Sequence, residues 1–236
     1  MQADTSVPGA DDVLAEYLAA LTAGTGLRPA AMTTPSGDLA AMPHLSEPLR
    51  MPWLNAARLV GTSNPTINHP ALRGAHKSAY MRRTFTDRHL AALYRFLTDP
   101  SYANPDTMVV LFSFGGQVNA TPWDATANAQ RASAFKMLFQ TFWADASGDA
   151  AGLGWARGLY EEFLRDTGGA PVPGEQYEGC YINYPDTDMK DPARNRSGVP
   201  WQTLYYQGNY PRLQRVKRRW DPANRFRHSL SVEPAG

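Results

Sequence analysis

Apolar residues recur at spacings of three and four in several stretches of the chain, and this period is typical of amphipathic helices. The first helix is predicted over Asp11–Leu21, with Asp11 as its N-cap and Gly24 just beyond its end. A second is predicted over Thr86–Leu97, with Thr86 as its N-cap. The apolar stripe of this second helix, which we expect to face the core, consists of Leu90, Leu93, Tyr94 and Leu97.

Two more helices are predicted in the second half of the chain. Residues Leu153–Leu164 keep the helical spacing. The other helix opens at Asn209-Tyr-Pro211, where proline suits the first turn, and Asp221-Pro222 ends it. Its inner face is expected to carry Leu213, Val216 and Trp220.

Runs of β-branched and aromatic residues predict the strands. A buried strand is expected over Met108–Phe114, followed by a Gly115-Gly116 turn and a partner strand through Gln117–Asn119. Residues Phe135–Trp143 alternate between two faces and predict another strand, and Gly179–Tyr184 predicts a short one. Residues 25–80 contain seven prolines and are expected to be irregular.

The order of these elements predicts the fold class. Helices and strands are interleaved but do not alternate evenly, so a doubly wound parallel sheet is disfavoured. We therefore expect an α+β fold with an antiparallel sheet flanked by helices.

Composition excludes several function classes. The chain has 236 residues, of which 43% are hydrophobic and 19% charged, and its formal net charge is +1. This balance argues against a nucleic-acid binder that depends on bulk charge. A mean hydropathy of −0.44, with no apolar run of about 18 residues, predicts no membrane span. The N-terminus shows no secretory signal, and the cellular compartment stays open between cytoplasmic and secreted.

General catalytic motifs are missing from the sequence. It has no dinucleotide or P-loop glycine motif, no zinc-protease helix and no nucleophile elbow. Its five histidines are scattered, and the lone Cys180 excludes both an internal disulfide and a multi-thiolate zinc site, so no metal site is expected. The basic run Arg215, Lys217, Arg218 and Arg219 is expected to be the solvated face of a helix.

Two segments of the last third stand out as a pair. The first is Cys180-Tyr-Ile-Asn-Tyr-Pro-Asp186, and the second runs from Tyr205-Tyr-Gln-Gly-Asn-Tyr-Pro-Arg-Leu to Asp221-Pro-Ala-Asn-Arg-Phe226. Together they resemble the C-terminal signature of the berberine-bridge-enzyme-like FAD-linked oxidases, within the vanillyl-alcohol-oxidase superfamily. More weakly, Ser78–Thr86 and Phe112–Asn119 resemble the substrate-binding domain of that family.

The resemblance implies an oxidoreductase that transfers a hydride from a hydroxyl-bearing substrate to FAD. The similarity is to bacterial members that oxidise sugar hydroxyls, including those on glycosylated natural products. It implies a substrate-binding α+β domain over residues 1–184 and a C-terminal segment, 185–236, that completes an FAD domain. Nothing in the chain matches the half that holds most of the flavin in such proteins, so a separate FAD-binding domain is the expected partner.

The resemblance also implies roles for individual residues. It places Tyr184 as the proton acceptor, with Tyr181 and Asn183 lining the flavin or the substrate. A regular strand would put Tyr181 and Asn183 on one face and Tyr184 on the other. Tyr206 and Asn209 lie where the family tail meets the flavin domain, although Asn209 is equally suited to cap the following helix.

Substrate contacts are expected near the double glycine. Gln117 and Asn119 offer amides to substrate hydroxyls, or they are residues at the end of a strand. Phe114 stands where some relatives have a second active-site tyrosine, which puts a two-tyrosine mechanism in doubt. Two other interpretations stay open, namely a stand-alone module that binds a ligand or partner without flavin, and a truncated gene fragment.

Overall fold

The structure, a computed structural model, describes residues 4–24, 26, 50–57 and 72–236. The chain divides into two compact units, residues 1–68 and 69–236. The described part of the first unit contains α1 (Ala10–Thr22) and α2 (Trp53–Ala57). The predicted helix over Asp11–Leu21 is therefore confirmed, but Gly9 rather than Asp11 takes the N-cap position.

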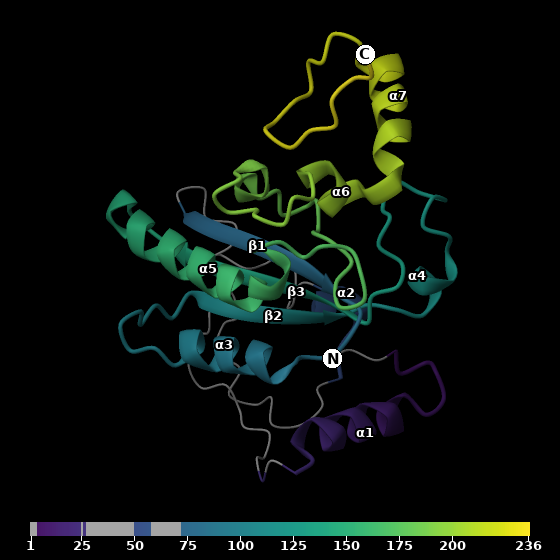
Figure 1. The fold of residues 1–236 in the computed structure, drawn as a ribbon. Coiled ribbons are helices and arrows are strands. Elements are labelled where there is room, and N and C mark those ends of the chain that lie inside the picture. The colour runs from purple at the N-terminus through teal and green to yellow at the C-terminus, as the bar shows by residue number, and fades with distance from the viewer. Residues whose placement is uncertain (1–3, 25, 27–49, 58–71) are drawn as a thin grey trace. The chain divides into compact units, whose positions relative to one another are not determined.

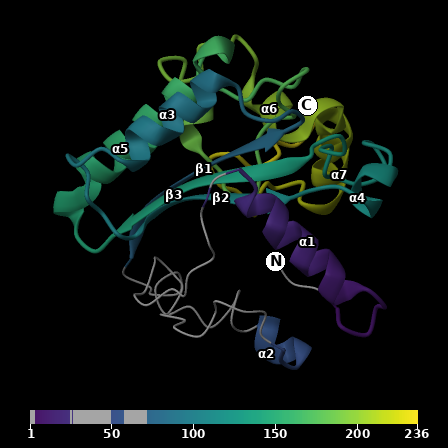
Figure 2. The same ribbon diagram turned by 90° about the horizontal axis from the view of Figure 1, so that it is seen from below.

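A three-stranded antiparallel sheet forms the centre of the second unit (Figure 1). Its order is β1-β3-β2, with β1 at Arg73–Met81, β3 at Phe135–Trp143 and β2 at Thr107–Ser113. The helices α3 (Asp87–Leu97) and α5 (Asp149–Phe163) cover the same face of this sheet (Figure 2). The expected α+β class, with an antiparallel sheet flanked by helices, is confirmed.

The central strand explains why one face of the sheet is packed against helices. Phe135, Phe139 and the residues that alternate with them point toward the helices, and Phe139 packs edge-on against both Tyr160 and Phe163 of α5. The residues between them, Lys136, Leu138, Gln140 and Phe142, point to the opposite face because strand side chains alternate. We call this opposite side the open face of the sheet, because α3 and α5 do not cover it, although Leu138 and Phe142 on it are buried.

Strand β1 was missed by the sequence analysis. Most of the stretch 25–80 lies outside the described residues, but Arg73–Met81 pairs along its whole length with β3, from Arg73↔Trp143 to Met81↔Phe135. The seven prolines all precede residue 71, so they do not interrupt this strand. The prediction of an irregular segment is wrong for these residues.

Helix α3 begins as predicted but turns a different face to the core. Thr86 caps it by accepting the His89 N–H on its hydroxyl oxygen, and the Thr86 N–H donates in turn to His89 Nδ1. The predicted stripe is right only at Leu93, because Leu90 and Leu97 are half exposed and Tyr94 is 74% exposed. The inner face instead carries His89, which stacks on Phe163 with centroids 4.2 Å apart, together with Ala92, Leu93 and Phe96.

Two expectations around the double glycine are wrong. Strand β2 is not a buried strand, since its second half is exposed at the edge of the sheet. Gln117–Asn119 do not form a partner strand but lie in a short helix, α4 (Gln117–Ala120). The pairing ends where Phe114 donates its N–H to Ala134, and Gly116, at φ 60°, then turns the chain away.

The C-terminal segment, residues 185–236, alternates between loops and short helices. It contains the 3-10 turns η4 (Thr187–Lys190) and η5 (Gln207–Asn209) and the helices α6 (Trp201–Tyr206) and α7 (Tyr210–Trp220). The 3-10 turns η2 (Ala146–Gly148) and η3 (Arg165–Thr167) lie at the two ends of α5. The predicted final helix and its stop at Asp221 are confirmed, while α6 was not predicted. The expected inner face is wrong for Val216, which is half exposed, and for Trp220, which is 75% exposed. No helix in the described ranges is long and apolar enough to cross a bilayer.

Candidate active site on the open face of the sheet

The segment that contains the predicted base runs along the outer edge of β1. Glu178 donates its N–H to Tyr80, and Tyr80 donates its own to Gly179, both at 2.9 Å. The pairing then stops, because Cys180 donates to Leu204 of α6 at 2.7 Å and Gly179, at φ 96°, turns the backbone. A side chain at Gly179 would collide with the Leu204 carbonyl, since its Cβ would lie 2.1 Å from that oxygen.

The predicted strand over Gly179–Tyr184 is therefore wrong beyond its first residue. Residues 181–184 form a turn in which Tyr184 donates its N–H to the Tyr181 carbonyl at 3.0 Å. Because these residues do not form a strand, the predicted alternation of Tyr181 and Tyr184 between opposite faces does not apply. The two rings instead lie together, with centroids 5.7 Å apart.

Both tyrosine rings pack on the open face of the sheet. Tyr181 contacts Tyr80 edge-on at 5.9 Å, and Tyr184 lies 5.4 Å from the ring of His76. His76 and Tyr80 share this face because they are four residues apart on β1. The predicted Tyr181 and Tyr184 are thus brought together on one surface.

Asn183 bonds directly to its neighbour. Its Nδ2 atom donates to the Tyr181 hydroxyl at 2.7 Å. Tyr181 and Asn183, both predicted to line the flavin or the substrate, are therefore hydrogen-bonded to each other.

Lys136 belongs to the same cluster and was not singled out by the sequence analysis. Its Nζ atom lies 3.6 Å from the centroid of the Tyr181 ring and 5.1 Å from that of Phe112. Burial lowers the pKa of the Lys136 amine. The available signal was a single cation inside an otherwise uncharged strand, Phe135–Trp143.

His76 presents a neutral ring beside Tyr184. Its Nδ1 atom is 2.9 Å from the amide nitrogen of Gln140, and Phe142 packs edge-on against it. Burial lowers the pKa of His76, so the imidazole is uncharged near neutral pH. The surface around Tyr184 therefore combines aromatic rings, an amide and an uncharged imidazole.

Of the predicted substrate contacts, Phe114 joins the tyrosine cluster. Its ring packs edge-on against Tyr80 at 5.1 Å. Gln117 and Asn119 lie on α4 and are exposed, and Asn119 donates its amide to the Ser133 carbonyl at 3.2 Å. They follow Phe114 and the double glycine in the chain.

Asn209 occupies the N-cap position of α7, but its side chain makes no capping bond, so the predicted side-chain cap is wrong. Its buried Nδ2 atom donates instead to the carbonyls of Trp123 and Thr126 at 3.0 and 3.1 Å. Arg212, one turn further on, donates to the Asp124 carbonyl at 2.9 Å. The start of α7 therefore holds the loop that follows α4.

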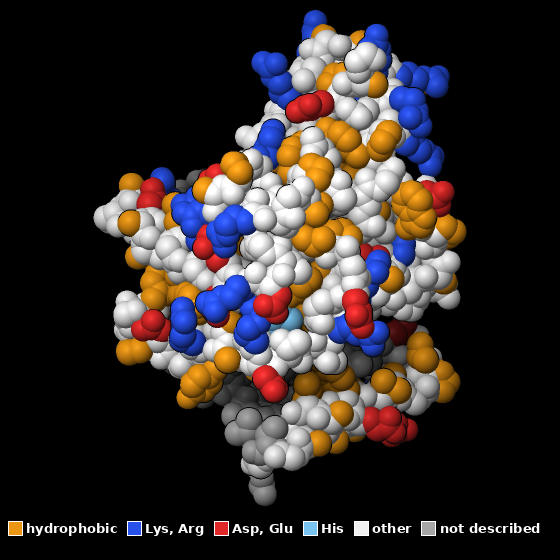
Figure 3. Space-filling model, viewed as in Figure 1, with side chains coloured by type: hydrophobic (Ala, Val, Ile, Leu, Met, Phe, Trp, Pro, Cys, Tyr) orange, Lys and Arg blue, Asp and Glu red, His pale blue; other side chains and the backbone are white. Residues whose placement is uncertain are grey.

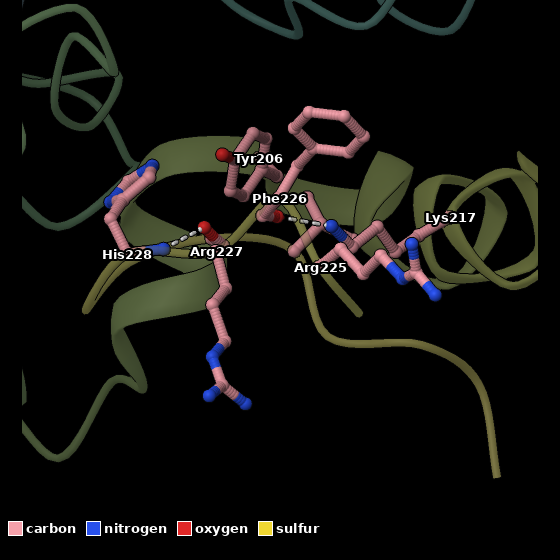
Figure 4. Close-up of a pocket in the computed structure, with 8 residues that line it drawn as sticks. Tyr206, Lys217, Arg225, Phe226, Arg227 and His228 are labelled. Carbon is pink, nitrogen blue, oxygen red and sulfur yellow. Dashed lines mark hydrogen bonds between the residues drawn. The ribbon is translucent and has the colours of Figure 1, made fainter. Parts of the chain in front are cut away.

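Tyr206 lines a hollow of about 620 Å³ between α6, α7 and the C-terminal loop (Figure 4). Basic side chains surround it, namely Lys217, Arg225, Arg227 and His228. Burial raises the pKa of Tyr206 to about 12. Lysine and arginine side chains also gather over α7 in the space-filling view, where the predicted basic run is exposed or half-buried (Figure 3).

Cys180 is not placed for nucleophilic chemistry. It is buried, and burial raises the pKa of its thiol to about 12. Among the residues with described positions, no group of three or more histidine, cysteine or acidic side chains is arranged to hold a metal ion.

Comparison with known proteins identifies the segment around the two tyrosines. The family model described as "Berberine and berberine like" matches residues 180–233, and the chain is 42% identical over all 236 residues to the aclacinomycin-N/aclacinomycin-A oxidase of Streptomyces galilaeus. The chain is therefore similar, along its whole length, to one part of a berberine-bridge-enzyme-like protein. It spans 39% of the length of that oxidase.

Solved structures of similar flavoenzymes contain the fold of this chain as one part of theirs. The flavoenzyme CrmK of caerulomycin biosynthesis superimposes with a TM-score of 0.80 at 36% identity, covering 98% of this chain and 43% of CrmK. The glycopeptide hexose oxidase DBV29, solved with teicoplanin, gives a TM-score of 0.79 at 37% identity, with 98% and 42% coverage. The chain thus spans about two fifths of the relatives it matches.

Proposed function

We propose that this chain is the C-terminal part of an FAD-dependent oxidoreductase that oxidises a hydroxyl group of a carbohydrate or glycosylated natural product. The observation that carries the proposal is the pairing of Tyr181 and Tyr184 on the open face of the sheet, next to Lys136. The names of the similar proteins support the substrate class, since one is an aclacinomycin oxidase and another a glycopeptide hexose oxidase.

The residues of the open face fit a flavin. FAD is the cofactor of this family, and when bound it accepts the hydride of the substrate. Tyr181 and Asn183 offer hydrogen-bonding groups on an aromatic surface, and Lys136 offers a positive charge that no described carboxylate neutralises. Such a charge stabilises negative charge that develops nearby during reaction.

Tyr184 is the base of the proposed reaction. An alcohol can lose a hydride only if its hydroxyl proton leaves as well, and a phenolate oxygen can accept that proton. The free phenol has a pKa of about 10, so the surroundings must favour its ionised form. In the proposed site Lys136, whose Nζ atom lies over the ring of the neighbouring Tyr181, is the cation of this surface.

The remaining predicted residues complete the proposal. Phe114, Gln117 and Asn119 would contact the substrate, with Phe114 already beside the tyrosine cluster. Tyr206 and Asn209 would lie next to the FAD-binding domain. The division at residue 184 into a substrate-binding domain and an FAD-completing segment is part of the same proposal.

The test is a fusion of this chain to the FAD-binding part of the aclacinomycin oxidase from Streptomyces galilaeus, in place of the segment it matches. The expected result is a yellow protein that retains FAD through gel filtration and whose flavin is bleached by hexoses or glycosides without oxygen. Tyr184→Phe should slow the bleaching by roughly 100-fold or more, which is within the range of general-base catalysis.

Each result of this test is decisive. A fusion that retains no flavin would favour a stand-alone module or a fragment and would overturn the proposal. A fusion that binds flavin and is reduced equally fast with Phe at position 184 would remove Tyr184 from the mechanism. Tyr94→Phe, which removes an exposed tyrosine hydroxyl outside the tyrosine cluster, is the matched control and should leave the rate unchanged.

A further inference from the structure

The hydroxyl of Tyr205 lies between the two backbone groups that flank Pro185. It accepts a hydrogen bond from the Asp186 N–H at 2.9 Å and donates one to the Tyr184 carbonyl at 3.5 Å. Tyr205 is buried in α6, and burial raises the pKa of its phenol well above the usual value. The hydroxyl therefore stays protonated and can serve both partners at once.

A buried ion cluster holds the same backbone from the other side. The Nζ atom of Lys77 lies 2.6 Å from Asp186 and 2.8 Å from Asp188. Arg157 of α5 binds both oxygens of Asp188, at 2.8 and 2.9 Å. Two cations thus balance two carboxylates, and the side chains of Lys77 and Asp186 are only 5% and 12% exposed.

Burial makes this cluster a firm anchor. Removing one member of a buried pair leaves an uncompensated charge and costs about 3–5 kcal/mol, far more than breaking an exposed pair. Asp186 also accepts the Asp188 N–H at 3.0 Å and so caps the 3-10 turn that follows it. The position of Asp186 is therefore set by both β1 and η4.

Two neighbouring residues of β1, whose side chains point to opposite faces of the sheet, hold the two ends of this segment. Ser78 accepts the N–H of Tyr181 at 2.9 Å on the open face, and Lys77 binds Asp186 on the helix-covered face. The segment 181–186 therefore crosses the edge of β1, with Tyr184 between its fixed ends. Pro185 reduces the conformations open to this backbone further. Its ring fixes its own φ and restricts the backbone conformation of Tyr184 before it.

We propose that Tyr205 and the Lys77–Asp186 pair are positioning groups, which fix the backbone on both sides of Tyr184 and so aim its phenol at the substrate. This inference rests on the proposed role of Tyr184 as base. Neither group touches the substrate itself. Their contribution is geometric, and misplacing a reacting group by about 1 Å can slow a reaction by roughly 100-fold.

The first test measures the geometry in the 236-residue chain without flavin. Tyrosine rings are labelled with ¹³C, and Tyr184→Phe assigns the signal of Tyr184. Tyr205→Phe and Asp186→Asn are each expected to shift and broaden that signal, while the overall fold is retained by circular dichroism. The matched control is Tyr177→Phe, which removes another buried hydroxyl, the one bonded to His89 at 2.7 Å.

The control should lower the melting temperature without changing the Tyr184 signal. An unchanged Tyr184 signal in both Tyr205→Phe and Asp186→Asn would overturn the inference. Hydrogen exchange in the unmodified chain provides a test that needs no variant. The Asp186 amide is expected to be protected as strongly as the amides of β3, and rapid exchange would contradict the inference even if both variants failed to fold.

The second test separates this inference from the proposed function. In the fusion, Tyr205→Phe is expected to lower kcat by roughly 10- to 100-fold with little change in KM, and Tyr177→Phe to leave kcat unchanged. If Tyr184→Phe has no effect on flavin reduction but Tyr205→Phe still disturbs the Tyr184 signal, the proposed role of Tyr184 as base fails and the structural link stands. If Tyr184→Phe abolishes reduction and Tyr205→Phe leaves kcat unchanged, the positioning role fails alone.

Discussion

Lys136 and Tyr181 form a cation–aromatic pair on the open face of the sheet, with the Nζ atom 3.6 Å from the ring centroid. The lysine projects from the central strand, and the tyrosine comes from a turn 45 residues later in the chain. Burial lowers the pKa of the amine, which means that the fold disfavours its charge. A residue that weakens the fold at a surface where two tyrosines meet is typical of a functional site.

Lys136→Met is expected to stabilise the chain at pH 7. The charge disappears, while the methionine side chain still packs on Phe112 and Tyr181. We expect the free energy of unfolding to rise by up to about 1 kcal/mol, because solvent screens part of the penalty at a half-buried site. Urea unfolding measures this change. Arg83→Met, at an exposed ion pair with Glu175, is the control and should change little. A loss of stability in Lys136→Met would show that the cation–aromatic attraction dominates.

Glu178→Gln is expected to destabilise the chain by about 2–4 kcal/mol at pH 7. Glu178 is 3% exposed and accepts bonds from the Ser133 hydroxyl and from the amides of Arg131 and Ala132. Burial raises the pKa of Glu178, but these donors and Arg82 outweigh it, so the pKa is lowered overall from its usual 4.5.

The sign of the pH effect follows from that direction. A carboxyl whose folded pKa lies below its unfolded value stabilises the fold above the unfolded value and loses this effect as the pH falls. The stability of the unmodified chain should therefore decline below about pH 4.5, and Glu178→Gln should show a smaller decline. Urea titrations at pH 7 and pH 4 test this, with the exposed Glu175→Gln as control. Equal slopes in the variant and the unmodified chain would contradict the assignment.

Asn209→Asp is expected to be more harmful than Asn209→Ala. The amide of Asn209 donates to two carbonyls, and an aspartate would place acceptor oxygens against acceptor oxygens. Alanine merely leaves the carbonyls without a donor, at a cost of about 1–3 kcal/mol. Tryptophan fluorescence should report the release of the loop that carries Trp123. If aspartate proves as stable as alanine, the donor role of Asn209 is wrong.

Gln207 has a strained backbone conformation, and a comparison of two substitutions can measure the energy of that strain. Its φ of 49° and ψ of −133° lie in a region that only glycine adopts readily. Gln207→Gly and Gln207→Ala both lose the bond from Nε2 to the Glu178 carbonyl at 3.1 Å. Only glycine relieves the strain, so it should be more stable than alanine by about 1–3 kcal/mol in thermal unfolding. Equal melting temperatures would mean that the turn carries no strain.

The elements with strong local patterns were predictable from the sequence. The alternating run Phe135–Trp143 is the central strand with the predicted bounds, because both its faces are covered and the period of two is required on each. Thr86 caps α3 as predicted, since a cap depends only on residues within one turn. The tyrosines of the proposed site were found through a family signature rather than through any local period.

The features that were predicted wrongly are set by contacts with residues that are distant in the chain. Residues Gly179–Tyr184 alternate like a strand, but the Cys180 amide is taken by Leu204 of α6, which nothing in the local sequence indicates. The apolar stripe of α3 is exposed because His89, a polar residue, packs against Phe163 in its place. Asn209 had the right residue type for a cap, yet carbonyls more than eighty residues earlier bind its amide.

The order β1-β3-β2 leaves the two edges of the sheet in different states. The edge of β1 is closed by residues 178–179, whereas nothing within the described segment 72–236 pairs with the outer edge of β2. Unpaired amides and carbonyls beside the exposed Leu111 and Phe112 are a template for another strand. Isolated copies of this polypeptide should therefore associate through β2 as their concentration rises, and a lysine or proline introduced there would keep them apart during purification.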